Sequence, residues 1–338
     1  MKRAIVMLAL FTVACGGGSD GGSGGPGGTP TAPTSPTSKV NGGQWSGRAP
    51  MIEANSELAV AELNGKLYVL GGYPANRQTA LTVQVYDIAS DSWTLGPSLP
   101  QPNNHGMAAG ANGKVYLIGG QPTDLSEGPY ADTVYELDPG RGTWVEKAKM
   151  PTARSSGVAV VHDGRIYVAG GRPPRGSDFA VYDPKSDSWQ TLPNLPSQRN
   201  HMTGAAIQGR IHIVGGRLGQ GLSANMTTVH EVFDPQTGGW TTAAPMLRAR
   251  SGMNGVMARG CFHVWGGEGP AGMFADHDSY DPRNNQWTAL NDMPIPVHGV
   301  YGSAFVDGVI WASGGGTNIG GSHGSLHNQV FFPTVSCD

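Results

Sequence analysis

Polar side chains recur at matching positions of this chain, beside segments whose residues alternate like short strands. When these segments are aligned on their hairpin turns, one matching position falls at the start of the first strand of each unit. It is occupied by Asn55, Asn103, Arg154, Arg199, Arg250 and His298. Other polar residues stand two positions further on (His105, His201) or directly after Gly-Gly pairs (Arg172, Arg217, Glu268). Guanidinium groups bind carboxylates, and amides and imidazoles bind hydroxyl groups. The set therefore predicts a site for an anionic or polyhydroxylated ligand.

The same residues have a structural interpretation. An arginine at the start of converging strands can satisfy loop carbonyls or a neighbouring carboxylate instead of a ligand. The residue types leave both roles open at any single position, and the binding role rests on the set as a whole.

A sixfold repeat places these residues. Gly-Gly pairs begin at Gly71, Gly119, Gly170, Gly215, Gly266 and Gly314. A tryptophan stands 26 residues before each pair, or 27 before the last, and in five units a Tyr, Phe or Leu stands seven residues before the next Trp. The interval from the Gly pair to that residue varies from 12 to 18 residues. The length variation therefore falls in one loop per unit, on one face of the molecule.

The period of 45 to 51 residues, made of short alternating segments, predicts a β-propeller with four antiparallel strands in each blade. In the third unit the expected strands are 157–161, 165–169, 179–182 and 189–192. Dipeptides such as Asn64-Gly65 suit two-residue hairpins, which require positive φ. The predicted fold class is all-β.

The ring is expected to close through its N-terminal strand. The last unit has a third strand around Phe331 but no tryptophan after it. Trp45 has the usual distance to the first Gly pair, yet no second or third strand precedes it. The segment 43–46 is therefore expected to complete blade six, which removes an exposed sheet edge.

The Gly-Gly doublet, the downstream Tyr and the Trp resemble the motif of the kelch-repeat family over residues 44 to 333. The resemblance implies a six-bladed kelch-type β-propeller over residues 43–338, acting as a non-enzymatic module that recognises a protein or glycan with its variable-loop face. A relative in the family is a periplasmic sialic-acid mutarotase with an Arg-bearing funnel. A sugar-acid mutarotase or epimerase is therefore the alternative, with Glu268 and either His201 or His298 as the acid–base pair.

No cofactor or metal is expected. The kelch-like copper enzyme galactose oxidase needs a Cys joined to a Tyr at the funnel, whereas Cys261 and Cys337 map to the opposite face. His323 and His327 stand four residues apart in a Gly-rich loop, where this spacing does not bring two imidazoles to one side as it would on a helix.

Residues 1–15 resemble a bacterial secretory signal. Lys2-Arg3 precede an apolar run too short to span a membrane, and Thr12-Val-Ala-Cys15 resembles a lipobox, with Thr12 in place of the usual aliphatic residue. The resemblance implies lipidation of Cys15 and an envelope lipoprotein at the outer membrane or cell surface. Residues 16–42 are then a Gly/Ser/Thr/Pro-rich linker. Ordinary cleavage, giving a periplasmic or secreted protein, is the alternative.

Cys261 and Cys337 are expected at the bottom of neighbouring blades, after a hairpin turn of blade five and after the third strand of blade six. Export would place them in an oxidising compartment. A disulfide and two free thiols are both compatible with this placement.

Composition excludes one class of partner. Charged residues make up 14% of the chain and the net charge is −3 with histidines neutral. Binding nucleic acid requires a clustered basic face, so nucleic acid is not an expected partner. We expect a monomer.

Overall fold

The computed structural model describes residues 38–74, 76, 78–124, 127–221 and 225–338. The chain divides into Met1–Ala32 and Pro33–Asp338, and every described residue belongs to the second unit. The expected signal peptide, Cys15 and most of the linker therefore lie outside the described residues. Within the described ranges, no helix has the length and apolar character needed to cross a membrane.

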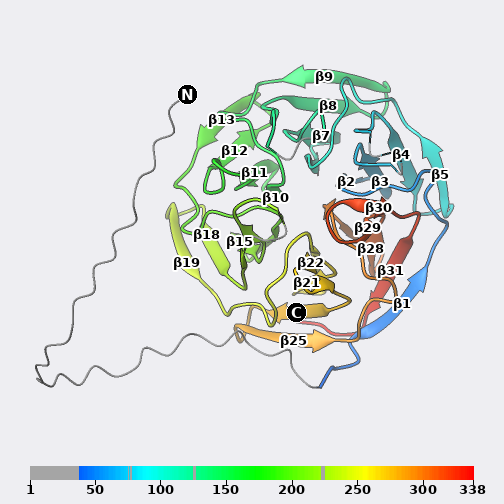
Figure 1. Ribbon diagram of the computed structural model, residues 1–338. Helices are drawn as coiled ribbons and strands as arrows, with labels where there is room; N and C mark the ends of the chain where they lie inside the picture. The colour runs from blue at the N-terminus through cyan, green and yellow to red at the C-terminus, as the bar shows by residue number, and fades with distance from the viewer. Residues whose placement is uncertain (1–37, 75, 77, 125–126, 222–224) are drawn as a thin grey trace, which may run out of the picture. The chain divides into compact units, whose positions relative to one another are not determined.

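Six antiparallel sheets form blades around a central axis (Figure 1). Blade one contains β2 (Leu58–Leu63), β3 (Lys66–Leu70), β4 (Val83–Asp87) and β5 (Ser92–Leu95), and blade two contains β6 (Met107–Ala111), β7 (Lys114–Ile118), β8 (Val134–Asp138) and β9 (Thr143–Lys147). Blade three contains β10 (Val158–His162), β11 (Arg165–Ala169), β12 (Phe179–Asp183) and β13 (Ser188–Thr191), and blade four contains β14 (Thr203–Ile207), β15 (Arg210–Val214), β18 (His230–Asp234) and β19 (Gly239–Thr242). Blade five contains β20 (Asn254–Ala258), β21 (Cys261–Trp265), β24 (His277–Asp281) and β25 (Gln286–Leu290). The predicted all-β propeller is confirmed.

Blade six is completed by the N-terminal strand. It contains β27 (Ala304–Val306), β28 (Val309–Ser313), β31 (Asn328–Pro333) and β1 (Gly43–Gly47). β1 pairs antiparallel with β31, and Trp45 lies opposite Phe331. In Figure 1 the blue β1 lies beside the red β31. The prediction that an N-terminal strand closes the ring is confirmed.

Among the described residues, three blades carry small hairpins in their second-to-third-strand loops. These are β16 (Arg217–Leu218) with β17 (Asn225–Met226), β22 (Glu268–Gly269) with β23 (Gly272–Met273), and β29 (Gly316–Asn318) with β30 (Ser322–Gly324). A further short strand, β26 (Val300–Tyr301), pairs in parallel with β2. We call the face formed by these loops and by the connections between blades the upper face.

Apolar side chains pack between neighbouring blades and form the core. At the junction of blades five and six, Trp45 and Phe331 pack with Trp265 in one cluster. The outer-strand tryptophans are less buried, and their indoles also donate hydrogen bonds to backbone carbonyls, as Trp189 does to Ala148 at 2.8 Å. Trp45 is therefore the most buried of the six outer-strand tryptophans.

We expect Trp45→Ala to lower the free energy of unfolding by about 3–5 kcal/mol, because a large side chain that is only 9% exposed would leave a cavity in the closing blade. Trp189→Ala removes a half-buried ring and should cost less, about 1–3 kcal/mol. Denaturant unfolding of both variants measures the difference. Equal losses would show that the closing strand is no more important than an ordinary outer strand.

Candidate functional site

Five of the residues expected to bind a ligand instead join each innermost strand to its own blade. Asn103 donates from Nδ2 to the carbonyl of Gly119 at 2.7 Å, and Asn55 donates in the same way to Gly71. Arg199 reaches the carbonyl of Gly215 at 2.8 Å. Glycine pairs lack side chains at this point, so a long polar side chain from the strand start can approach their backbone.

Three arginines of this group are fully buried. The guanidinium of Arg199 lies 2.6 Å from Glu231, and that of Arg250 lies 2.8 Å from Asp278. Arg154 donates to the carbonyls of Val168 and Asp178, and burial lowers its pKa to about 10. Asn55, Asn103, Arg154, Arg199 and Arg250, which the sequence predicts as ligand-binding residues, are each at most 2% exposed and hydrogen-bonded within the blades. The structural interpretation applies to them.

His298 is displaced by one residue from the position that the turn alignment gave it. In each blade the second glycine of the pair donates to the carbonyl of the next blade's starting residue, as Gly72 does to Asn103 at 2.7 Å. Gly267 makes this bond to Val297 at 2.9 Å, so Val297 is the true equivalent. An extra residue near Gly302, with φ of 124°, splits the innermost strand into β26 and β27. This extra residue shifts the hairpin turn by one position relative to the start of the innermost strand.

A continuous ring of backbone hydrogen bonds surrounds the upper mouth of the channel. We call its members the inner ring: Glu57, His105, Ser156, His201, Gly252 and Gly299. From His105 to Gly299, the amide of each member donates to the carbonyl of the one before it, at 2.8 to 3.0 Å. Leu58, next to Glu57, closes the circle by donating to Gly299 at 3.1 Å. Each blade therefore contributes one residue to the inner ring.

All six members have positive φ, between 51° and 67°. Blades five and six use glycine there, which adopts this conformation without steric cost. The other four members, Glu57, His105, Ser156 and His201, adopt it at a cost of about 1 kcal/mol or more each. Backbone strain of this kind is concentrated at functional sites, so these side chains are candidates for a role beyond packing.

His105 and His201 each hold an arginine. The Nδ1 atoms face Oδ1 of Asn104 and Asn200, so Nδ1 carries the proton and Nε2 is the acceptor. Nε2 of His105 accepts from Arg172 at 3.0 Å and Nε2 of His201 accepts from Arg217 at 2.7 Å.

Burial and the nearby arginines keep both imidazoles neutral. Burial lowers the pKa of His105 to about 3, and Arg172 and Arg217 add to this effect. The pKa of His201 lies well below its usual value for the same two reasons. Neutral imidazoles therefore orient the guanidinium groups rather than repel them.

Two carboxylates balance these arginines. Glu268 accepts from Arg217 at 3.0 Å and from the amide of Gly320 at 2.8 Å. Glu57 accepts from the hydroxyl of Tyr301 at 2.9 Å. Burial alone would raise the pKa of Glu57, but the interactions with His105, whose Nε2 lies 3.1 Å away, and with His298, together with the hydrogen bond from Tyr301, outweigh it, so the pKa is lowered and the carboxylate is ionised.

His298 lies between the two carboxylates. Its Nε2 is 3.3 Å from Glu57 and 3.5 Å from Glu268. Burial opposes its protonation, but both carboxylates favour it, and the net effect raises the pKa of His298. Of the expected acid–base residues, the structure thus brings Glu268 and His298 together, while His201 is linked to Glu268 through Arg217.

The cavity above this network is small. It has a volume of about 150 Å³ and is lined by Glu57, His105, Arg172, Arg217 and Glu268, together with loop glycines such as Gly320. Sites for drug-sized ligands occupy about 300–1,000 Å³. A wider space of about 350 Å³ lies further along the channel, lined by the innermost strands. The upper mouth is therefore largely filled by protein groups that satisfy one another.

Glu57, His105 and His201 are also the one group of described residues whose ligand atoms converge as metal ligands would, within 4.8 Å of one another. The acceptor nitrogens of both histidines already receive hydrogen bonds from arginine. A cation there would lie beside two guanidinium groups, so this arrangement favours an internal polar network over a metal centre.

The comparison of the six repeat units did not identify Glu57 and Tyr301 as site residues. Glu57 stands two positions after Asn55, the same offset that identified His105 and His201, so its position carried a usable signal. Tyr301 follows the disturbed alignment of blade six and has no counterpart in the repeat pattern.

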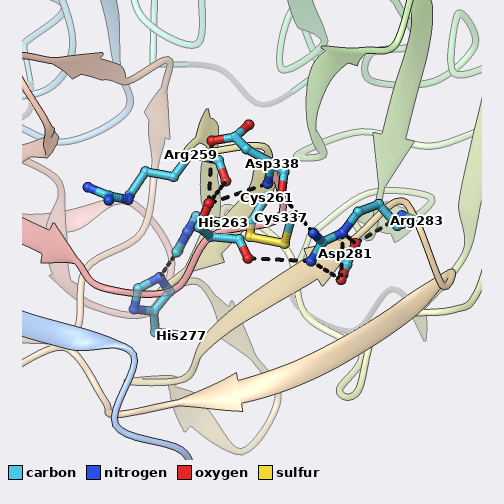
Figure 2. Close-up of a disulfide and its surroundings, with 9 residues drawn as sticks. Arg259, Cys261, His263, His277, Asp281, Arg283, Cys337 and Asp338 are labelled. Carbon is cyan, nitrogen blue, oxygen red and sulfur yellow. Dashed lines mark hydrogen bonds and ion pairs between the residues drawn. A yellow bond between two sulfur atoms is a disulfide. The ribbon is translucent and has the colours of Figure 1, made fainter.

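At the opposite end of the blades, Cys261 and Cys337 form a disulfide with a Cα–Cα distance of 5.0 Å (Figure 2). The amide of Cys337 donates to Arg259 at 2.8 Å, and Arg283 reaches the carbonyl of Asp338 at 2.9 Å. Thr334 donates to Gly42, just before β1. The C-terminal tail thus connects blade five with the start of the closing strand.

Known proteins share this repeat and fold. Residues 33–216, just over half of the chain, match the family model described as KLHDC2/KLHL20/DRC7 Kelch-repeats domain. The chain is 42% identical to Kelch-like protein 7 of Rattus norvegicus over 184 residues, which cover 53% of this chain and 31% of that protein. It is 32% identical to Kelch-like protein 23 of Mus musculus over 75 residues, covering 22% of this chain and 13% of that protein. The chain therefore spans less than a third of the length of these relatives.

The solved structure of YjhT has a similar fold. The two structures superimpose with a TM-score of 0.70, and the alignment covers 83% of this chain and 96% of that chain. Sequence identity is 17%, so the likeness concerns the fold.

We expect Arg217→Met to lower the free energy of unfolding by about 3–5 kcal/mol, because it leaves Glu268 buried without its cation. Arg217→Met combined with Glu268→Met should cost less than Arg217→Met alone, since the uncompensated charge is gone. Arg165→Met is the control, as its ion pair with Asp183 is exposed and should contribute under about 1 kcal/mol. Equal losses for Arg217→Met and Arg165→Met in denaturant unfolding would contradict the buried-pair account.

Proposed function

Because the chain belongs to the kelch-repeat family of β-propellers, we propose that it is a non-enzymatic binding module that recognises a protein or glycan with its upper face. One observation carries the proposal. The groups at the channel mouth are hydrogen-bonded to one another, whereas the loop hairpins above them present apolar side chains to solvent.

The exposed apolar residues favour a protein partner. Leu218, on the hairpin of blade four, is 41% exposed, and Ile319, on the hairpin of blade six, is 40% exposed. Gly221 and Gly320, from the same two loops, both line the small cavity, so these loops converge over the mouth. Apolar side chains raised above a polar base are common in the centres of protein interfaces.

Loop length supports the same use. The constant positions of the repeat form the blades, and the second-to-third-strand loops differ in length from blade to blade. A rigid scaffold with variable loops on one face suits recognition, because the loops can differ without disturbing the core.

We also propose that the protein is exported and lipid-anchored through Cys15. The signal-like residues 1–15 support export, and the Cys261–Cys337 disulfide is of a kind that persists in oxidising compartments. The linker of residues 16–42 would then separate the propeller from the membrane.

A sugar-acid mutarotase is the second candidate function. The placement of His298 between Glu57 and Glu268 favours it, because the two carboxylates line the cavity and can exchange protons with this histidine. Against it, Arg217 is engaged by Glu268 and His201, and the cavity is small for a sugar acid. Anomer exchange that the wild-type protein accelerates, followed by NMR, would favour this candidate over the binding module.

We expect the variant Leu218→Glu/Ile319→Glu to cross-link about tenfold less partner than the wild-type protein, because two charges replace apolar contacts. The amount is measured by quantitative cross-linking of the full chain in cell envelopes. The control Leu95→Glu/Val145→Glu changes side chains that are 61% and 54% exposed on the outer strands β5 and β9, and should retain the partner. A partner captured equally by both variants would place the interface elsewhere. A glycan array probed with the same variants tests the glycan case.

Cys15→Ala should move the protein from the detergent-extracted membrane fraction to the soluble fraction, because it removes the residue that would carry the lipid. Mass spectrometry of the membrane form should show a diacylglycerol modification on residue 15. A Cys15→Ala protein that stays with the membrane would refute the lipid anchor, and an unmodified wild-type protein in the soluble fraction would indicate ordinary cleavage.

A further inference from the structure

Two histidine pairs occupy equivalent positions in neighbouring blades. Nδ1 of His212 lies 2.8 Å from Nε2 of His230 in blade four, and Nδ1 of His263 lies 2.9 Å from Nε2 of His277 in blade five. Each pair joins the second strand of its blade to the third. All four side chains are buried.

The fold does not require histidine at these positions. The equivalent residues of blades one to three are tyrosines on the second strand (Tyr68, Tyr116, Tyr167) and apolar residues on the third (Val83, Val134, Phe179). Blades four and five therefore differ from their neighbours in holding groups that can take up protons inside the core.

The blade-five pair lies at the seam where the ring closes. The ring of His277 is 5.4 Å from that of Trp45 on β1 and 4.5 Å from that of Phe331 on β31. Trp45 and Phe331 are themselves paired across the two strands. Figure 2 shows His263 near the disulfide that fastens the C-terminal tail, with His277 on its far side.

The blade-five pair is also the less satisfied of the two. In blade four, Nδ1 of His230 donates to the carbonyl of Ala244 at 3.1 Å. In blade five, Nε2 of His263 and Nδ1 of His277 have no hydrogen-bond partner among the described residues. A further proton on this pair would bury an N–H group without an acceptor, which destabilises the folded state.

The surroundings keep the blade-five pair neutral. Burial lowers the pKa of His263 to about 4, and burial, together with His263 and Arg250, places the pKa of His277 well below its usual value. Arg250, which is paired with Asp278, is the charged group that acts on His277, while β1 and β31 present the aromatic rings of Trp45 and Phe331.

The blade-four pair is neutral as well. Burial lowers the pKa of His212 to about 3, with His230 and Arg210 adding to the effect. Burial lowers the pKa of His230 to about 4, opposed by the carbonyl of Ala244 and assisted by Arg199. Tyr280 of blade five packs on this pair, with ring centroids 4.8 Å from His230.

We propose that the seam between blades five and six is an acid-sensitive closure, in which protonation of His263 and His277 loosens β1 and opens the ring. In the open seam the histidines have an ordinary pKa of 6.5, whereas in the closed seam it is lower. The open form therefore binds more protons between pH 6.5 and about 4, and the closed form loses stability as the pH falls through that range. Above pH 6.5 the closure is insensitive to pH.

The size of the effect follows from linkage. One histidine with a pKa of 6.5 in the open seam and about 4 in the closed seam makes opening about 30-fold more favourable at pH 5 than at pH 7.5. Hydrogen exchange measures this opening, because the β1 amides that are hydrogen-bonded to β31 exchange only when β1 is released. The exchange rate of peptides from 39–47 is divided by that of β10 and β11 peptides of blade three in the same sample, which provides an internal reference.

For the full-length wild-type protein, this ratio should rise about 30-fold between pH 7.5 and pH 5. The variant His263→Tyr/His277→Val carries the residues of blade one and should raise the ratio less than about threefold. The matched variant His212→Tyr/His230→Val changes the blade-four pair and should keep the wild-type response. If the blade-five double variant does not fold, His263→Gln is used, and it should clearly reduce the response.

Three outcomes overturn the proposal. The first is a ratio that does not change with pH in the wild-type protein. The second is an unchanged response in a folded blade-five variant, and the third is a response lost equally in the blade-four variant. These results are independent of the proposed binding function, because no partner takes part in the measurement.

Discussion

The inner ring of backbone hydrogen bonds at the upper mouth is the interaction on which the rest of the site depends. It joins all six blades through one residue each, and every member has a left-handed backbone conformation. This conformation turns the chain from the connection between blades into the innermost strand. It also directs the side chains of Glu57, His105 and His201 toward one another near the axis, where the arginines that follow the Gly pairs meet them.

The balance of charge at the mouth explains why a ring of polar residues need not be a ligand site. Arg172 and Arg217 are held by neutral imidazoles, and Glu268 neutralises Arg217. A buried guanidinium is tolerated when every nearby acceptor is aimed at it, and such a network gives rigidity. In this propeller the polar mouth thus supports the loops above it, which remain free to differ and to contact a partner.

Much of the architecture could be predicted from the sequence, because Gly pairs and tryptophans at fixed intervals report directly on blade packing. The number of blades and the closing strand at Trp45 followed from these intervals. The roles of Arg154 and Arg199 did not, since a backbone carbonyl that accepts from a guanidinium has no signature in the sequence. His298 was assigned to the wrong position because one inserted residue near Gly302 shifts the hairpin turn by one position relative to the inner ring. The turn can be recognised in the sequence, whereas the inner ring cannot.

The closing strand also determines when the chain can finish folding. Gly43 pairs with Pro333, so blade six joins residues from the two ends of the propeller. The other five blades are each built from a contiguous stretch of chain and can form as soon as that stretch is available. Contacts between residues so distant in sequence carry a large loop-closure cost and form slowly. Until the final strand is available, β1 cannot complete blade six, and in that interval its exposed edge is open to pairing with another chain.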